Sequence, residues 1–210
     1  MSKGIAYFLV VLTFVLNEEK VSHDSRIDIA DTFHSTFACK SDTVEIDLIK
    51  SKILWKGTKM MGMGKHEGEI AIQKGFLLYQ NDELIGGEIT VDMKSITVTD
   101  IPASDPIPIR NLTNHLKSSD FFDVDKYPLS HLNIRKVQKS QGNKLLVTGS
   151  LTIKGISNKV SFGVENVGRN HFIANLQIDR FEWDIAYKGS WVDRTLVDRE
   201  IELKVEIVCK

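Results

Sequence analysis

The histidines and cysteines of this sequence are not spaced as metal ligands or as parts of a nucleophilic centre. No two histidines have the H-x-x-x-H spacing of a helical zinc site, and two cysteines are too few for a structural zinc site. The chain has neither a G-x-S-x-G elbow nor a phosphate-binding P-loop. We therefore expect no metal, no cofactor and no catalytic residues. The six histidines are His23, His34, His66, His115, His131 and His171.

The run Asp120–Asp123 places two phenylalanine rings between two carboxylates. The carboxylates can accept backbone N–H groups in a turn, while the rings of Phe121 and Phe122 enter a hydrophobic core. The same rings can also form part of the wall of a lipid tunnel, and the two roles are compatible. We expect His66, beside Glu67 in a hairpin, to be a surface residue.

Arg180 is close in sequence to Trp183 and Tyr187. An arginine beside aromatic rings can hold a lipid phosphate or a quinone oxygen at the mouth of a cavity. The interpretation that we favour is a cation–π or salt-bridge pair on the outer wall of the fold.

Hydrophobic residues alternate with polar ones from Thr43 onward, which is typical of half-buried antiparallel strands. The clearest example is residues 200–207, in which every second residue is apolar. Short turn signals separate about eight such segments, and a meander of this length exposes two edges unless the sheet closes. The sequence therefore predicts an all-β fold, an eight-stranded antiparallel up-and-down barrel, with a two-sheet sandwich as the alternative.

One segment has helical spacing instead of alternation. Ile109, Leu112 and Leu116 lie at i, i+3 and i+7, which predicts a short helix over about 109–118. A single helix inserted in a β meander plugs one end of a barrel or packs across a sheet.

Three segments resemble the YceI-like family of polyisoprenoid- or lipid-binding proteins with a lipocalin-like barrel. They are Asn114–Val124 with Lys126-Tyr127-Pro128 just after it, Val147–Gly155, and Val91–Ile96. These motifs occur in the family's order, and the resemblance covers about residues 43–209. It implies a periplasmic or secreted barrel that holds a long isoprenoid or another lipid inside, without a known reaction. Some relatives pair up, so a homodimer is compatible with the resemblance.

The apolar residues that face inward on this interpretation suit a hydrocarbon chain better than a polar metabolite. An eight-stranded barrel is either filled by its own side chains or holds one narrow ligand, and the alternation does not distinguish these cases. With the resemblance, this favours a non-enzymatic lipid-binding protein. Its predicted ligand-binding residues are Trp55, Phe76, Phe121, Phe122, Phe162, Phe172, Phe181 and Arg180.

The alternative is an enzyme that acts on an apolar quinone-like or isoprenoid substrate at the mouth of the barrel. Its polar centre would be Asp120, His115 or Arg180, and its only basis is that these residues could gather at one barrel end.

The amino terminus has the composition of a secretory signal. Met1-Ser2-Lys3 is short and positive, and Ile5–Leu16 is apolar apart from Thr13 but too short to span a bilayer. We expect a signal peptide over 1–20, a linker over 21–42 and the barrel over 43–210, with no membrane span in the mature protein. A buried strand or helix of the domain is the alternative for the apolar run.

Charge and cysteine content complete the expectations. Lys and Arg total 27 and Asp and Glu total 28, and the resulting net charge of −1 argues against a nucleic-acid partner.

In an up-and-down barrel the first and last strands are neighbours, so Cys39 and Cys209 would lie near one end and could form a disulfide in an oxidising compartment. An unpaired Cys39 in a linker and a small apolar Cys209 are an equally weighted alternative.

Overall fold

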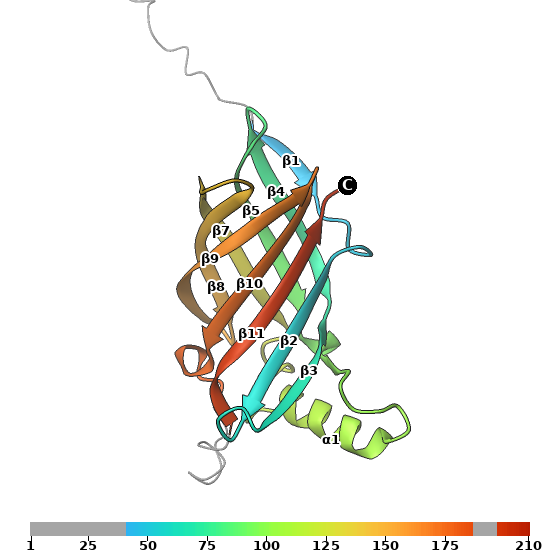
Figure 1. Ribbon diagram of the computed structural model, residues 1–210. Coiled ribbons are helices and arrows are strands. Elements are labelled where there is room, and N and C mark those ends of the chain that lie inside the picture. The colour runs from blue at the N-terminus through green and yellow to red at the C-terminus, as the bar shows by residue number, and fades with distance from the viewer. Residues whose placement is uncertain (1–40, 187–196) are drawn as a thin grey trace, which may run out of the picture. The chain divides into compact units, whose positions relative to one another are not determined.

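A computed structural model describes residues 41–186 and 197–210 of the chain. The predicted signal peptide over 1–20, the linker as far as residue 40, Cys39 and Tyr187 lie outside the described residues. The all-β prediction is confirmed, and Figure 1 shows the strands with one α-helix at the lower end.

Within the described part of the chain, eleven strands form one antiparallel sheet. Their order across the sheet is β1-β4-β5-β7-β8-β9-β10-β11-β2-β3-β6. The strands are β1 (Asp42–Glu45), β2 (Lys52–Lys59), β3 (Gly64–Ile70), β4 (Ile72–Gln80), β5 (Glu83–Asp92), β6 (Thr97–Val98), β7 (Leu129–Lys139), β8 (Lys144–Ile153), β9 (Ile156–Gly168), β10 (His171–Asp179) and β11 (Val197–Val208).

The predicted count of eight strands is wrong, because two of the long strands are interrupted. Only Ala71 separates β3 from β4, and β1 pairs with β4 while β2 pairs with β3. The break between β1 and β2 is a turn in which the Asp47 carboxylate accepts the N–H groups of Ile49 and Lys50, at 3.1 and 3.2 Å. The two-residue β6 adds the remaining strand.

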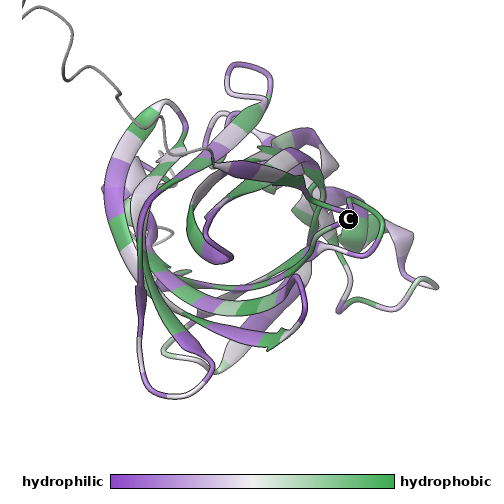
Figure 2. Ribbon diagram, turned by 90° about the horizontal axis from the view of Figure 1, so that it is seen from above, coloured by the Kyte–Doolittle hydropathy of each residue, from purple (hydrophilic) through white to green (hydrophobic). Residues whose placement is uncertain are grey.

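The sheet curls into a ring, which Figure 2 shows in the view from above, and its first and last long strands, β2 and β11, lie side by side in Figure 1. β11 pairs with β2, and an isolated bridge joins Ile46 to Cys209 beyond the end of β11. The backbone N–H of Lys210 donates to the Glu45 carbonyl at 2.9 Å, which extends the same contact. These bonds pair edges that a flat sheet would leave exposed, as expected for a barrel.

The helix α1 (Pro106–Lys117) begins three residues before the predicted helix and ends one residue earlier. Pro106 and Pro108 are accommodated because the first-turn N–H groups have no partner within a helix. Of its apolar stripe, Leu116 is buried, while Ile109 and Leu112 pack partly buried against the barrel core. The helix therefore lies across the lower end of the barrel (Figure 1).

The buried side chains form two clusters along the barrel. One includes Trp55 and Trp183 and lies beside α1, and the other includes Ile46 and Cys209 and lies beside the strand closure. Two 3-10 helices complete the described elements, η1 (Met93–Ser95) and η2 (Arg180–Trp183).

β9 and β10 pair only near the hairpin that joins them. The paired residues are His171–Ala174 on β10 and residues between Val164 and Gly168 on β9. The helix η2 is attached where the two strands have separated. The indole Nε1 of its Trp183 donates to the Leu151 carbonyl at 3.1 Å, so this ring closes the lower core from the side.

Candidate binding cavity

The barrel encloses an apolar cavity of about 190 Å³ at its lower end, beside α1. Its wall combines Trp55 of β2, Leu116 of α1 and the two rings of Phe121 and Phe122 with aliphatic residues of β5, β7, β8, β10 and β11. A smaller apolar cavity of about 70 Å³ lies farther up the barrel. The two cavities share the wall residues Ile89, Leu132, Leu176 and Val205.

The shared residues make the two cavities neighbours along one apolar path. Leu84 and Phe172 line the upper cavity and also a surface pocket at the opposite end of the barrel. The two cavities therefore lie one after the other from the α1 end through most of the barrel, and none of the described residues that line the upper cavity is charged. Such a shape suits one narrow, extended hydrocarbon chain.

The structure brings together five of the eight predicted ligand-binding residues. Trp55, Phe121 and Phe122 line the lower cavity, and Phe162 and Phe172 line the upper one. Phe76, Phe181 and Arg180 line neither cavity. Whether the five aromatic residues contact a ligand stays a prediction.

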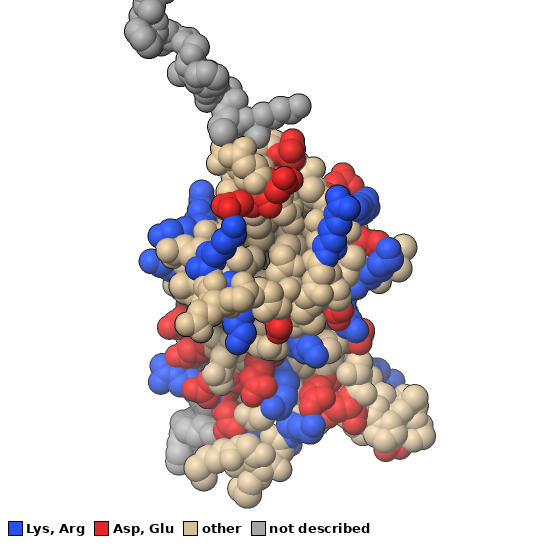
Figure 3. Space-filling model, turned by 45° about the horizontal axis from the view of Figure 1, so that its top comes forward, with Lys and Arg blue, Asp and Glu red and all other residues tan. Residues whose placement is uncertain are grey.

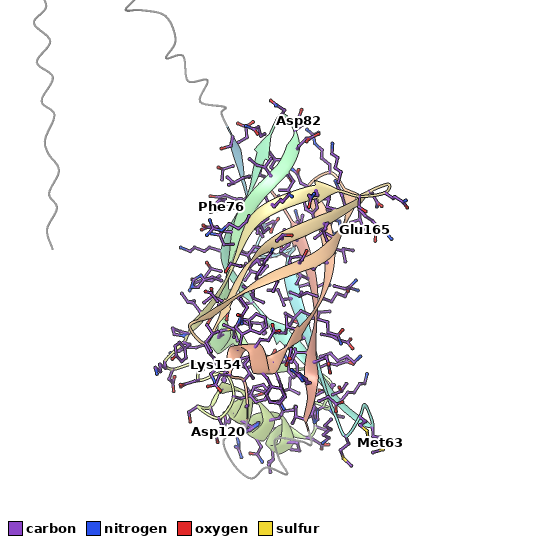
Figure 4. All side chains as sticks on the ribbon, turned by 90° about the vertical axis from the view of Figure 1, so that its left-hand side faces the viewer. Met63, Phe76, Asp82, Asp120, Lys154 and Glu165 are labelled. Atoms are coloured by element: carbon purple, nitrogen blue, oxygen red, sulfur yellow. The ribbon has the colours of Figure 1, made fainter. Side chains whose placement is uncertain are left out.

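Phe76 lies on the other face of β4 because the strand contains a bulge. Ile72 pairs with Val91 and Lys74 pairs with Thr90, so one extra residue stands between the two pairs. A bulge of this kind reverses which residues face inward beyond it. Leu77 is therefore buried at 3% exposure, while Phe76 is half-buried on the outer face (Figure 4).

Trp55 is held in place by a contact that needs a glycine. Its Nε1 donates to the Thr97 carbonyl of β6 at 3.1 Å. Gly68 stands opposite Trp55 in the β2–β3 pair, and a Cβ there would lie 1.8 Å from the same carbonyl and 2.6 Å from the indole nitrogen. The missing side chain lets the indole lie flat against β3 and reach β6.

Phe121 and Phe122 enter the barrel through the turn that follows α1. The two rings are 6% and 7% exposed and meet edge to face, with centroids 5.0 Å apart. Backbone carbonyls accept the hydrogen bonds of this turn. The N–H of Phe122 donates to the Leu116 carbonyl at 3.1 Å, and the N–H of Asp123 donates to the Ser118 carbonyl at 2.8 Å. The carboxylates of Asp120 and Asp123, predicted as acceptors, are not the acceptors in these bonds.

Arg180 is a structural residue of the barrel wall. Its side chain is 1% exposed and donates to the carbonyls of Ile185 at 2.7 Å, Val197 at 3.0 Å and Asp198 at 3.0 Å. Its guanidinium carbon also lies 4.1 Å from the centroid of the Phe181 ring. A cation–π contact is therefore present, but it is made with Phe181 by a buried arginine and not on the outer wall, and the arginine ties η2 to the start of β11.

The lower cavity has a polar rim that the sequence did not reveal. His66 and Lys65 of β3, His115 of α1, and Thr58 and Asp198 are among the residues that line it. The His66 side chain, expected at the surface, is 34% exposed and also lines this rim. His66 pairs with Gly57 on the inward face, and its Nδ1 lies 3.1 Å from the Asp100 carboxylate.

The three residues of the alternative catalytic centre do not gather around the cavity. His115 lines its lower part, with its ring centroid 5.7 Å from that of Phe121. Asp120 and Arg180 do not line it.

Ser130 is a polar residue inside the otherwise apolar part of the cavity. It is the second residue of β7, lies opposite Val91 of β5 and is 4% exposed. Its hydroxyl is buried and has no hydrogen-bond partner in the structure, although the residue lines the cavity. An unpaired buried hydroxyl is unfavourable unless something fills the space beside it and bonds to it.

Comparison with known proteins places this architecture in a family. The profile of the YceI-like domain matches residues 44–209, which is nearly all of the described barrel. The chain belongs to the YceI-like family. A UPF0312 protein of Vibrio campbellii is 27% identical over 148 residues, which cover 66% of this chain and 76% of the relative. A UPF0312 protein of Staphylococcus aureus is 38% identical over 88 residues, 41% of this chain and 48% of the relative.

Two solved structures share the fold of this YceI-like protein. The crystal structure of BcnA from Burkholderia cenocepacia matches with a TM-score of 0.63 at 24% identity, covering 77% of this chain and 98% of BcnA. A polyisoprenoid binding domain from Saccharophagus degradans, implicated in plant cell wall breakdown, matches with a TM-score of 0.55 at 10% identity. This second match covers 80% of the chain and 97% of that domain. Among the described helices of the YceI-like chain, none is long and apolar enough to cross a membrane.

Proposed function

We propose that this YceI-like protein is a non-enzymatic binding protein that holds an isoprenoid or another long-chain lipid inside its barrel. The observation that carries the proposal is the apolar path formed by the two cavities that share Ile89, Leu132, Leu176 and Val205. The name of the Saccharophagus degradans domain, which describes polyisoprenoid binding by that protein, supports the same ligand class.

The polar groups of the lower cavity suggest how the ligand is oriented. Ser130 offers an uncharged hydroxyl inside the cavity, and His66 and His115 line its rim. A ligand with a long apolar chain and one oxygen-bearing end would place the chain in the upper cavity and the oxygen near these groups.

The test is to purify the protein from bacteria and identify what it carries. Native mass spectrometry and organic extraction should reveal a co-purifying lipid, and delipidated protein should bind an added isoprenoid quinone. Leu132→Trp should fill space at the wall that the two cavities share and reduce retention of the lipid. Leu146→Trp is the matched control, because Leu146 is 43% exposed.

The outcome that contradicts the proposal is a protein that is empty as purified and ignores added isoprenoid quinones. Turnover of a quinone or isoprenoid that is lost in Asp120→Asn or His115→Ala would contradict the non-enzymatic part alone. Thermal melts of both tryptophan variants are needed, since overpacking a core costs about 1–3 kcal/mol.

We also propose that the protein is exported and works in the periplasm or outside the cell, with residues 1 to about 20 removed as a signal peptide. The support is the positive start followed by the apolar run Ile5–Leu16. N-terminal sequencing of protein from the periplasmic fraction tests this. An intact Met1 on cytoplasmic protein would refute it.

A further inference from the structure

The turn between β2 and β3 carries three methionines that face solvent. Met60, Met61 and Met63 are 46%, 93% and 75% exposed. Large apolar side chains gathered on a surface typically mark a contact with a membrane or another molecule. We call Met60–Met63 the methionine turn.

The methionine turn has a defined backbone conformation. Met60 and Met61 have φ of 53° and 55°, in the left-handed region that residues other than glycine and asparagine rarely adopt. The Asp198 carboxylate of β11 holds this shape by accepting the N–H groups of Met61 at 3.0 Å and Gly62 at 2.9 Å. The exposed side chains are therefore presented by a turn that is tied to the barrel wall.

The methionine turn lies at the polar rim of the lower cavity. Its flanking residues Lys59 and Lys65 line that cavity, and so does Asp198. Met63 marks this end in Figure 4, opposite Asp82 at the other end of the barrel. Ile107 of α1, also at the lower end, is 60% exposed, and Figure 3 shows the protruding parts of this end mostly free of charged side chains.

We propose that the methionine turn inserts into the surface of a lipid bilayer and thereby sets the mouth of the cavity against the membrane. The inference rests on the proposed function, because it concerns how an apolar ligand enters and leaves. A lipid that passes through water exposes the methylene groups of its chain. Each exposed methylene makes this water-exposed state roughly fourfold less populated. A mouth that touches the bilayer avoids this barrier for a long chain.

The charges around the mouth indicate that apolar insertion, not attraction to anionic lipid, drives the contact. Lys59 and Lys65 line the same cavity as Asp198 and Glu200, and Lys65 is paired with Glu67 at 2.5 Å. Two cations and two carboxylates around one opening leave little net attraction for an anionic surface. We therefore expect binding to uncharged phosphatidylcholine vesicles and little loss at high salt.

The experiment is flotation of the protein with phosphatidylcholine vesicles in 0.1 M and 0.5 M NaCl. The test variant is Met61→Asn/Met63→Asn, since asparagine tolerates the left-handed backbone at position 61. The matched control is Ile49→Asn, because Ile49 is 96% exposed just before β2 and the methionine turn follows β2 directly. We expect partitioning to fall roughly tenfold or more in the test variant, as burial of one methionine side chain is worth about that factor.

Two further measurements separate this inference from the proposed function. Equilibrium binding of an isoprenoid quinone in detergent should be unchanged in the test variant, because neither substituted residue lines the cavity. Transfer of the quinone from vesicles to protein should slow in parallel with vesicle binding. Vesicle binding without quinone binding would support membrane insertion of the methionine turn and refute the proposed ligand.

The inference is overturned if the wild-type protein does not float with vesicles, or if the test variant floats equally well. It is also overturned if Ile49→Asn has the same effect, since the contact would then not be at the mouth. Binding that disappears in 0.5 M NaCl would assign the contact to charge and would contradict insertion.

Discussion

Two buried serines of the barrel wall differ in what surrounds their hydroxyls. Ser51 is 8% exposed, donates to the Val208 carbonyl at 3.2 Å and accepts the Val208 N–H at 2.9 Å. Ser130 is 4% exposed, and its hydroxyl has no hydrogen-bond partner. We expect Ser51→Ala to lower the free energy of unfolding by about 1–3 kcal/mol and Ser130→Ala to leave it unchanged or raise it in the empty protein.

The Ser130→Ala variant also tests how the ligand is oriented. If a ligand oxygen bonds to Ser130, Ser130→Ala should weaken binding of an isoprenoid quinone about 2–10-fold, as measured by titration of delipidated protein. A purely hydrocarbon isoprenoid should bind the wild type and Ser130→Ala equally. Equal quinone affinity in wild type and Ser130→Ala would mean that the oxygen lies elsewhere.

The thiol of Cys209 should react slowly in the folded protein. The side chain is 8% exposed, and burial raises its pKa above the ordinary value of 9.0. At pH 8 less of the reactive thiolate is present than in an exposed cysteine, so iodoacetamide should label Cys209 much faster in urea than in buffer. In urea without reductant, labelling of both cysteines would support the unpaired alternative, and labelling of neither would support a bridge between Cys209 and Cys39.

The residues that sequence reasoning placed well are those whose neighbours alternate regularly. Trp55 follows the pattern of β2, and the motif containing Phe121 and Phe122 marks the turn into the barrel. Phe76 was misplaced by a single bulged residue in β4. His66 is partly exposed as predicted, but its place on the cavity rim was not foreseen, because polar residues on a barrel rim have the sequence pattern of surface residues. Register between strands, not composition, decides both cases.

At the scale of elements, Asp198 should make the attachment of the methionine turn sensitive to acid. The Thr58 hydroxyl and then the N–H groups of Met61 and Gly62 hold the pKa of Asp198 below its ordinary value of 3.8. The charged form therefore stabilises the fold above pH 3.8, and this contribution is lost as the pH falls through the lower folded-state pKa. Asp198→Asn should reduce the Tm at pH 7, and this reduction should shrink as the pH falls below 3.8.

Thermal melts of both proteins from pH 2 to pH 7 provide the measurement. A Tm difference that stays constant over this range would show that the loss comes from the changed side chain's geometry and not from its charge.

The turn after α1 should depend on its second phenylalanine. Phe122 is 7% exposed and lines the lower cavity, so Phe122→Ala should lower the free energy of unfolding by roughly 3–5 kcal/mol and reduce lipid retention. Phe76→Ala is the matched control, because Phe76 lies half-buried on the outer face of β4 and lines neither cavity. Equal losses in the two variants, by urea denaturation, would contradict the assigned orientations.

Elements were predictable where local chemistry fixes them and less so where turns interrupt them. The apolar stripe predicted the helix over 106–117, while its start lies three residues earlier than predicted because the first turn, with Pro106 and Pro108, precedes the stripe. The break between β1 and β2 depends on one side chain, Asp47, which bonds to two N–H groups of its own turn. Such interruptions change the count of strands without changing their order.

At the scale of the molecule, the sequence indicated a closed meander because alternating segments with short turns leave two edges to be paired. The structure pairs them through β2 and β11 and through Ile46 and Cys209. The cavity itself was not predictable, since alternation shows which side chains face inward and not whether they fill the space. The family resemblance supplied the ligand class, which the residues alone did not.

The pairing of β2 with β11 has a consequence for how fast the protein folds. Ser51 and Val208, which bond to each other, are 157 positions apart in the chain. Contacts between such distant residues form slowly, because a long loop must close before the hydrogen bonds are gained. Until then β2 and β11 are open edges that can pair with strands of other chains. Refolding should therefore become less efficient as the protein concentration rises, although the finished barrel pairs both edges within itself.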